Sequence, residues 1–183
     1  MYLVSADKEG YLKICDFGFA KVVPFKTYTL CGTPEYIAPE VLLNKGHGRG
    51  VDWWTLGILL YEMLVGDPPF LAEDPMEIYQ QILTCKVKFT RSYDKNAKSL
   101  TKKLLTSDMT RRYGCLKQGA SDIKMHKYFG DMNWDALLAK QLDAPIKPEL
   151  SSSTDTSNFE EYPEDTEEAV PPEYDGPDPF EDF

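Results

Sequence analysis

The sequence lacks closely spaced cysteines and has little histidine. Its four cysteines are far apart and form no Cys-x-x-Cys pair, and only two histidines are present among the 183 residues. A structural zinc site needs close pairs of such ligands. We therefore expect no zinc site, and we expect the cysteines to be free thiols in a reducing compartment.

Long hydrophobic segments and basic stripes are also missing. The most apolar run, residues 51–66, contains Asp52 and Glu62 and is too short to span a bilayer. The opening MYLVSADKEG has neither the basic region nor the apolar region of a secretory signal. Nucleic-acid binding requires a clustered basic surface, and the sequence shows none. We therefore predict no transmembrane segment and no nucleic-acid partner.

Lysine and arginine are absent from the last part of the chain. The net charge is −10, but 13 of the 30 acidic residues lie from Pro148 onward, which leaves 20 basic and 17 acidic residues in the first 147. Helical periodicity also ends there, and prolines recur. Such a segment cannot bury enough apolar surface to fold alone. We predict an extended acidic tail whose aromatic residues dock on another surface.

The remaining sequence predicts a short β-hairpin followed by helices. Runs at residues 2–5 and 11–15 flank an Asp-Lys-Glu-Gly turn in which Gly10 would adopt a positive φ. Residues 24–36 are rich in Thr, Gly and Pro without periodicity, which predicts a long ordered loop. The nearly all-apolar run predicts a helix buried on most faces. The expected helices are residues 51–66, 75–84, 96–106 and 133–141.

Two short motifs carry the strongest chemical signal. Residues 14–20 read ICDFGFA and residues 27–40 read TYTLCGTPEYIAPE, so Asp-Phe-Gly and Ala-Pro-Glu enclose Gly-Thr-Pro-Glu-Tyr. This combination is typical of protein kinases. With NKGHG, VDWWTLGILLYEMLVGDPPF, SDMTRRYG, DTSNFEEYPED and the terminal FEDF, the chain resembles the large lobe of an AGC-group Ser/Thr protein kinase. It most resembles cAMP-dependent catalytic subunits, although its tail is also similar to those of cGMP-dependent kinases.

The resemblance implies a fold class and two domains. The fold would be mainly α: a protein-kinase large-lobe fragment with a short N-terminal β-hairpin, an extended acidic C-terminal tail and no small lobe. Residues 1–129 would be the C-terminal part of the kinase domain, and residues 130–183 the AGC C-terminal extension. The family's Gly-rich loop, strand Lys and His-Arg-Asp loop have no match here. We expect a C-terminal fragment that is inactive alone; the alternative is a non-catalytic kinase-lobe protein that acts as a binding or regulatory module.

The resemblance also implies ATP and Mg²⁺ as cofactors. Asp16 matches the carboxylate that binds Mg²⁺ and through it the ATP phosphates, a role that suits a hard oxygen ligand. Phe17 would pack into the lobe beneath it. Thr33 matches the hydroxyl that bridges the catalytic Asp and Lys, and the catalytic base itself is not in this chain. Phe159 matches the aromatic residue that completes the adenine pocket.

Thr29 matches the activation-loop phosphorylation site. An upstream kinase or autophosphorylation would modify it, adding a dianion that basic side chains can clamp. Lys21 matches one residue of that clamp, and Lys26 lies close by in sequence. Thr27 and Tyr28 also carry hydroxyl groups, so residue chemistry alone does not select Thr29.

Carboxylates define the implied substrate class. Glu35 and Glu62 match residues that receive arginines of a basic substrate, and a carboxylate suits bidentate guanidinium binding. Glu62 also lies in an apolar helix, where a buried charge needs a partner. We expect Arg-rich protein substrates and a cyclic-nucleotide-binding regulatory subunit as partners. An apolar wall for the residue after the phosphoacceptor would consist of Leu30, Pro34 and Ile37.

The last implied roles are structural. Glu40 and Arg112 match a buried ion pair that ties the activation segment to the lower lobe. Asp52 matches the residue that holds the backbone of the catalytic loop. His47 and His126 match nothing catalytic, so we interpret them as surface or packing residues. The resemblance implies a cytoplasmic protein that also enters the nucleus.

Overall fold

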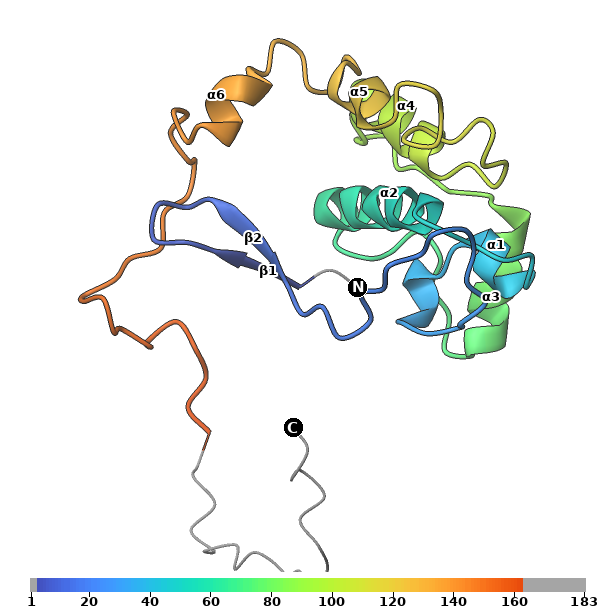
Figure 1. Ribbon diagram of the computed structural model, residues 1–183, viewed down its shortest axis with the longest axis horizontal. Coiled ribbons are helices and arrows are strands. Elements are labelled where there is room, and N and C mark those ends of the chain that lie inside the picture. The colour runs from blue at the N-terminus through green and yellow to red at the C-terminus, as the bar shows by residue number, and fades with distance from the viewer. Residues whose placement is uncertain (1–2, 163–183) are drawn as a thin grey trace, which may run out of the picture. The chain divides into compact units, whose positions relative to one another are not determined.

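The computed structural model describes residues 3–162, with side chains described from residue 6 onward. The chain divides into two compact units, Met1–Pro148 and Glu149–Phe183. The first unit contains the helices and strands of the described residues (Figure 1). In the second, residues 149–162 form turns and bends without a helix or strand. The rest of the predicted acidic tail, including the FEDF motif, lies outside the described residues.

The N-terminal part of the first unit is a two-stranded hairpin. Strand β1 (Leu3–Ala6) pairs antiparallel with β2 (Leu12–Cys15), close to the runs at residues 2–5 and 11–15 that predicted a hairpin. In the turn, the Asp7 carboxylate accepts a hydrogen bond from the backbone N–H of Tyr11 at 2.9 Å. Gly10 has φ +86°, a conformation that costs glycine little because it has no Cβ. The predicted hairpin and its glycine are thus both present.

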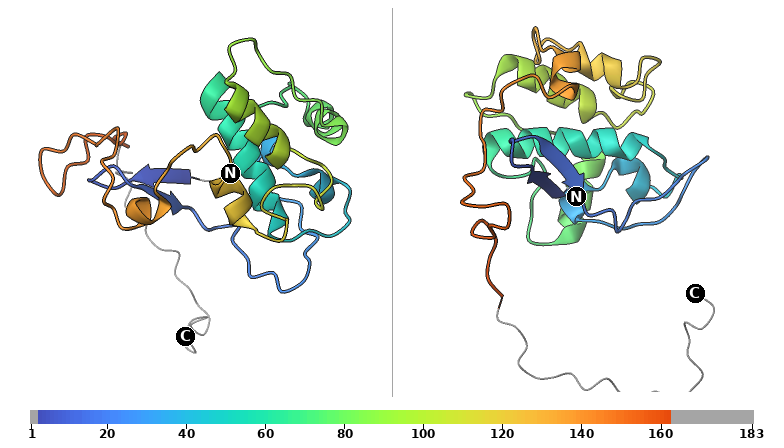
Figure 2. Two further views of the ribbon diagram at one scale, coloured as in Figure 1. Left: turned by 90° about the horizontal axis from the view of Figure 1, so that it is seen from above. Right: turned by 60° about the vertical axis from the view of Figure 1, so that its left-hand side comes forward.

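A segment near residue 140 packs on this hairpin. Helix α6 (Trp134–Leu138) leads into this segment (Figure 2). Just after α6, the Lys140 ammonium group lies 2.8 Å from the Asp7 carboxylate. The Tyr11 hydroxyl donates a hydrogen bond to the backbone carbonyl of Leu142. Contacts between residues more than 130 positions apart therefore hold the hairpin turn in place.

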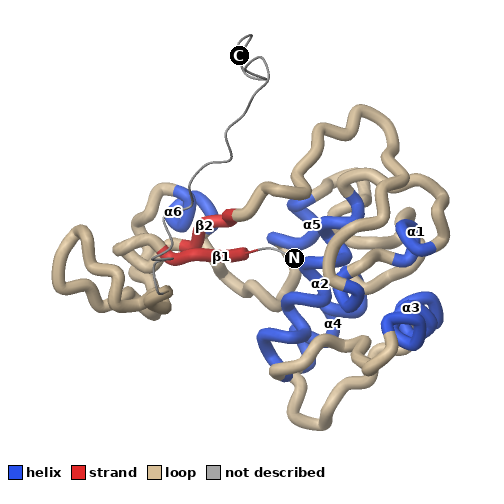
Figure 3. The backbone as a smooth tube through the Cα atoms, turned by 90° about the horizontal axis from the view of Figure 1, so that it is seen from below, coloured by secondary structure: helices blue, strands red, loops and turns tan. Residues whose placement is uncertain are grey.

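Helix α2 (Gly50–Val65) is the centre of the helical part of this unit (Figures 1 and 3). It packs along α4 (Lys95–Leu104) and also contacts the short 3₁₀ helix η1 (Pro34–Tyr36). Helix α3 (Pro75–Thr84) contacts both η1 and the short helix α1 (Pro39–Leu42). The loop that carries the sequence motifs therefore ends against the most apolar helix.

Local capping explains where these helices begin and end. Gly66 terminates α2 in the left-handed region at φ +99°, as expected of a C-terminal glycine. Asp74 and Asp94 cap the N-termini of α3 and α4 with their side-chain oxygens. Asn133 does the same for α6, which is shorter than predicted. Helix α5 (Ala120–Lys124), like α1 and η1, was not predicted because it is too short to show periodicity.

The core consists of three clusters that share α2. Trp54 is fully buried and stacks on Phe70 with ring centroids 6.0 Å apart. Tyr61 stacks on Tyr93 in another cluster. The buried apolar residues are, by cluster, Ala38, Trp54, Ile58, Phe70, Ile78, Ile82 and Leu105; Leu60, Leu100, Leu104 and Ile123; and Tyr61, Tyr93 and Ala97.

The expectation that α2 is buried on most faces is correct only for its first part. Its contributions to the core clusters end at Tyr61. Met63, Leu64 and Val65 in the last turn are exposed, Met63 by 66%. The sequence pattern could not distinguish these positions, because apolar residues occupy the covered and the uncovered parts of the helix alike.

The sequence also predicted free cysteines and no transmembrane segment. Cys31, Cys85 and Cys115 are free thiols, as predicted. Within residues 3–162, no helix combines the length and the apolar character needed to cross a membrane. Among its described residues, the fold of the first unit rests on packing, hydrogen bonds and ion pairs.

Candidate functional site

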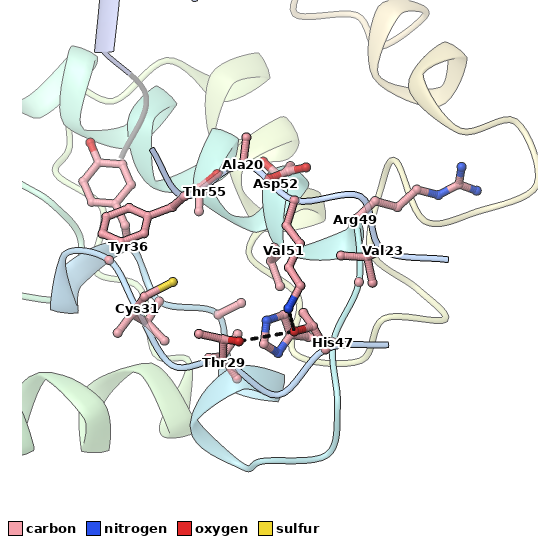
Figure 4. Close-up of a pocket in the computed structure, with 18 of the residues that line it drawn as sticks. Ala20, Val23, Thr29, Cys31, Tyr36, His47, Arg49, Val51, Asp52 and Thr55 are labelled. Carbon is pink, nitrogen blue, oxygen red and sulfur yellow. Dashed lines mark hydrogen bonds between the residues drawn. The ribbon is translucent and has the colours of Figure 1, made fainter. Parts of the chain in front are cut away.

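An open cavity of about 690 Å³ lies between the motif-bearing loop and the start of α2 (Figure 4). Its lining comes from the end of β2, from the loop that follows, from η1 and α1, and from residues 47–55. Tertiary packing thus gathers segments that are up to 41 positions apart, between Ile14 and Thr55. Five of the predicted site residues line it: Asp16, Thr29, Thr33, Ile37 and Asp52.

Asp16 has an unusual backbone conformation at the edge of this cavity. Its φ is +60°, in the left-handed region that non-glycine residues rarely adopt and that costs about 1–2 kcal/mol. Its Oδ1 accepts a hydrogen bond from the backbone N–H of Gly18 at 3.3 Å, which closes the turn. Strained conformations of this kind concentrate at functional sites. The turn leaves the carboxylate exposed to the cavity.

Phe17 does not pack beneath Asp16, contrary to the expectation from the sequence. Its side chain is 67% exposed, and that of Phe19 is 76% exposed. The core clusters are built mainly on α2, α3 and α4, and none of them includes either ring. Within the described residues, therefore, Phe17 of the Asp-Phe-Gly turn and Phe19 just after it are exposed to solvent.

Thr29 is exposed and belongs to a short chain of polar contacts (Figure 4). Its hydroxyl oxygen lies 3.4 Å from that of Thr27, and the Lys21 ammonium group donates to the Thr27 hydroxyl at 3.0 Å. Lys26 instead donates to the backbone carbonyl of Lys45 at 3.4 Å. Of Lys21 and Lys26, only Lys21 therefore connects to Thr29 in this structure, and it does so through Thr27.

His47 is a cavity residue that the sequence did not reveal. Its backbone forms an antiparallel bridge with Thr27, with both N–H···O distances at 2.9 Å. Burial lowers the pKa of its imidazole, the Glu40 carboxylate opposes this shift, and Lys21 adds to it. No sequence signal could have identified it, because a single histidine in a glycine-rich loop has many structural roles.

Two glutamates flank Tyr36. The Tyr36 hydroxyl donates a hydrogen bond to the Glu62 carboxylate, which comes from the second half of α2. Burial is the largest cause that raises the pKa of Tyr36 well above its ordinary value. The hydrogen bond to Glu62 and the negative charges of Glu62 and Glu35 raise it further. One carboxylate oxygen of Glu35 is buried and has no hydrogen-bond partner within the described residues. The geometry therefore combines a positioned carboxylate with a second acceptor that still needs a donor.

The three residues of the predicted apolar wall differ in exposure. Ile37 is buried and lines the cavity. Pro34 begins η1 and is half-buried, whereas Leu30 is 57% exposed. Of the three residues, only Ile37 therefore belongs to both the core and the cavity surface.

Glu40 and Arg112 form the expected buried ion pair. The two guanidinium NH groups lie 2.6 and 2.8 Å from the two carboxylate oxygens, which is a bidentate geometry. The Arg112 side chain is fully buried and also donates to the carbonyls of Thr106 and Gly50. These bonds fix α1 to the start of α2 and to the loop that follows α4.

Asp52 and Phe159 lie in different compact units. Asp52 is an exposed residue in the first turn of α2, and its backbone carbonyl accepts a hydrogen bond from the Thr55 hydroxyl at 3.0 Å. Phe159 belongs to the unit that begins at Glu149 and is 71% exposed. Its N–H donates to the Thr156 carbonyl at 2.9 Å.

The described residues fit one mode of Mg²⁺ binding. They contain no group of three or more His, Cys, Asp or Glu side chains that could enclose a metal ion. Mg²⁺ is commonly held by one or two carboxylates together with substrate phosphates and water. Asp16, a single exposed carboxylate on an open cavity, suits this mode and does not suit an all-protein metal cage.

The chain is similar in sequence to known protein kinases. The model of the protein kinase domain matches residues 3–129. The cAMP-dependent protein kinase catalytic subunit PRKX of Mus musculus is 53% identical over 168 residues, which cover 92% of this chain and 47% of that relative. A catalytic subunit-like cAMP-dependent protein kinase of Caenorhabditis elegans is 54% identical over 87% of this chain and 40% of its own length. The catalytic subunit of Dictyostelium discoideum is 49% identical over 95% of this chain and 27% of its own. The chain thus spans half or less of the length of these relatives.

Proposed function

The chain belongs to the protein kinase domain family, and on this premise we propose that it is the C-terminal part of a cAMP-dependent type of Ser/Thr protein kinase. The whole protein would transfer the γ-phosphate of ATP to Ser or Thr of Arg-rich protein substrates. The observation that carries this proposal is the cavity that gathers Asp16, Thr29, Thr33 and Asp52 from separate segments.

The chain contributes positioning groups to this reaction. Bound Mg²⁺ neutralises charge on the phosphates during phosphoryl transfer. Asp16 would hold the metal through its exposed carboxylate, and its left-handed backbone supports a specialised role. Thr33 would hydrogen-bond the catalytic groups supplied by the rest of the protein, and Phe159 would complete the adenine pocket. Asp52 would hold the catalytic-loop backbone.

Glu62 and Glu35 would select arginine in the substrate. The hydrogen bond from Tyr36 orients the Glu62 carboxylate, while the unpartnered oxygen of Glu35 offers a further acceptor. A guanidinium group has several donors and can satisfy two carboxylates at once. Leu30, Pro34 and Ile37 would form the apolar wall for the next substrate residue.

Regulation and partners follow from the same family premise. Thr29 would be phosphorylated by an upstream kinase or by autophosphorylation, and a cyclic-nucleotide-binding regulatory subunit would be the partner. The 183-residue chain alone would be inactive, because catalysis needs several positioned groups together. Incubation of this chain with ATP, Mg²⁺ and an Arg-rich peptide should give no product above a blank. Turnover would contradict this part of the proposal.

The substrate assignment is tested by replacing Glu62 in the whole protein. Glu62→Gln keeps the shape of the side chain but removes the charge that would pair with arginine. We expect kcat/KM to fall roughly tenfold to hundredfold for a peptide with Arg before the phosphoacceptor, since a charge-assisted hydrogen bond is lost. A peptide with norleucine in place of that Arg should be affected far less.

The matched control is Glu77→Gln, an exposed glutamate on α3. It should leave kcat/KM for both peptides unchanged. Equal losses for both peptides in Glu62→Gln would show that Glu62 acts structurally, through its bond with Tyr36. An inactive whole protein that still binds partners would instead favour a non-catalytic binding module.

A further inference from the structure

Thr27, Thr29 and His47 lie on one face of a short antiparallel bridge. Thr27 and His47 exchange both backbone hydrogen bonds, so they form a directly opposed pair. Opposed side chains in such a pair point to the same face, and so do residues two positions apart on one strand. The 3.4 Å contact between the Thr27 and Thr29 hydroxyl oxygens agrees with this arrangement. All three residues line the same cavity, and Figure 4 labels Thr29 and His47.

This face carries both cationic and acidic groups. Lys21 donates to Thr27 and is close enough to His47 to lower its pKa. Arg49 also lines the cavity. The acidic groups are Asp16 and Asp52, which line it as well, and Glu40, whose charge reaches His47 but is already paired with Arg112. An anion at Thr29 would lie near the Lys21 ammonium group, which reaches the neighbouring Thr27, and would be attracted to it.

The His47 imidazole is free to take a new partner. Within residues 6–162, no hydrogen bond involves its ring nitrogens, whereas both ring nitrogens of the buried His126 are engaged. His126 Nε2 lies 3.0 Å from the Ser99 hydroxyl, and its Nδ1 accepts from the Tyr128 N–H at 3.1 Å. The ring nitrogens of His47 are therefore available to bind a new group, whereas those of His126 are already hydrogen-bonded.

We propose that His47 is a ligand of the phosphate at Thr29, acting with Lys21. This inference rests on the proposed function, which makes Thr29 the phosphorylated residue. A phosphate at Thr29 extends beyond the hydroxyl and presents three acceptor oxygens to the face that it shares with His47. Protonated imidazole donates from both nitrogens, so it suits this role better than the neutral ring.

The proposal makes the phosphate site sensitive to pH. Histidine and the second ionisation of a phosphate both titrate between about pH 6 and 7, so the two groups are coupled. A dianion beside the ring favours its protonated form, and the protonated ring favours the dianion. The contact therefore weakens as pH rises through the pKa of His47 and as pH falls through that of the phosphate.

The test uses the 183-residue chain with phosphothreonine installed at position 29 by semisynthesis, beside the unmodified chain. Only two histidines are present, so proton NMR follows both imidazole titrations, and His47→Gln assigns them. Phosphorylation should raise the pKa of His47, changing its protonated-to-neutral ratio at pH 7 by roughly tenfold. The pKa of His126 should not move.

Phosphorus NMR supplies the reciprocal measurement. Because coupling is mutual, the pKa of the phosphate should fall in the wild-type chain by as much as that of His47 rises. In His47→Gln the phosphate pKa should return toward that of an isolated phosphothreonine. An unmoved His47, or equal shifts in both histidines, would overturn the proposal. Failure of an upstream kinase to modify Thr29 would count against the proposed function instead, since the installed phosphate does not depend on it.

Discussion

Two ion pairs hold two different regions of the first unit. In the helical region, Arg112 and Glu40 form a buried bidentate pair. In the hairpin region, Lys140 pairs with Asp7 and Glu9, and its side chain is 43% exposed. The first pair cannot be solvated if it is broken, whereas the second can exchange its partners for water. Similar charges therefore differ in energetic importance because of burial.

The same contrast separates covered and uncovered apolar side chains. The helical region buries its large residues in three clusters built around α2. The loop that leads from β2 toward η1 instead exposes several, among them Phe17, Phe25 at 92% and Val22 at 90%. Single polar contacts, such as that of Lys21 with Thr27, organise this loop. We conclude that the helical region supplies its own stability, while the loop depends on a few specific bonds.

The largest effect is expected from Arg112→Ala. The change strands the buried Glu40 carboxylate and two backbone carbonyls, so the free energy of unfolding should fall by about 3–5 kcal/mol. Urea denaturation followed by tryptophan fluorescence measures this. Arg111→Ala, an exposed neighbour, is the control and should change little.

A double substitution sharpens this result. Glu40→Leu with Arg112→Met removes both charges, and it should destabilise the fold less than Arg112→Ala alone, because no buried charge is left without a partner. A melting transition that is unchanged in Arg112→Ala would mean that the pair contributes nothing to stability.

An intermediate effect is expected from Gly10→Ala in the hairpin. The positive φ alone should cost about 1–2 kcal/mol. A Cβ at this position would also lie 2.3 Å from the Ile146 carbonyl oxygen, so the turn or the segment near residue 146 must shift. Gly66→Ala is the matched control, because Gly66 also has a positive φ but has no atom within 4 Å of the added carbon.

Hydrogen exchange locates this destabilisation. In Gly10→Ala, backbone amides of β2 should exchange faster, while those of α4 should keep their protection, because the defect lies in the hairpin region. If Gly66→Ala and Gly10→Ala have equal effects on the free energy of unfolding, the close approach to Ile146 is not important for stability.

The smallest effect is expected from the exposed pair of Lys140 and Asp7. The hydrogen bond from Lys140, followed by that from the Tyr11 N–H, lowers the pKa of Asp7 to about 2. Its contribution is therefore fully present above about pH 4, the ordinary carboxyl value, and is lost as pH falls through about 2. Lys140→Met should raise the pKa of Asp7, so that this loss begins at a higher pH.

Carbon NMR of the Asp7 carboxyl group measures that titration directly. Lys147→Met is the control, because Lys147 pairs with exposed Asp143 and not with the hairpin. The same Asp7 pKa in wild type and Lys140→Met would show that the backbone N–H groups of Tyr11 and Glu9 set it.

Much of the fold could be predicted because the relevant signals are local. The hairpin turn needed Gly10, and α2 ends at Gly66 as predicted. The predicted bounds of α3 agree with the structure, and α4 starts one residue earlier than expected. Helices of four or five residues, such as α1 and α5, were missed because they are held by tertiary contacts rather than by periodicity.

The candidate site was predicted less completely than the fold. Motif resemblance predicted site roles for Asp16, Thr29 and Thr33, and the structure gathers all three at one cavity. It did not identify His47, which reaches that cavity only through its bridge with Thr27. It also misjudged Phe17, since the position of a ring depends on whether another part of the molecule covers it.

The sequence by itself determined the class of the molecule: the family, the helical periods, the caps and the acidic tail all follow from local residue patterns. Tertiary structure alone decided which charges are buried and which residues share a surface. Arg111 and Arg112 are adjacent and chemically identical, yet one is exposed and the other fully buried against Glu40. The physical reason is that burial and pairing depend on packing between segments distant in the chain, and no local pattern contains that information.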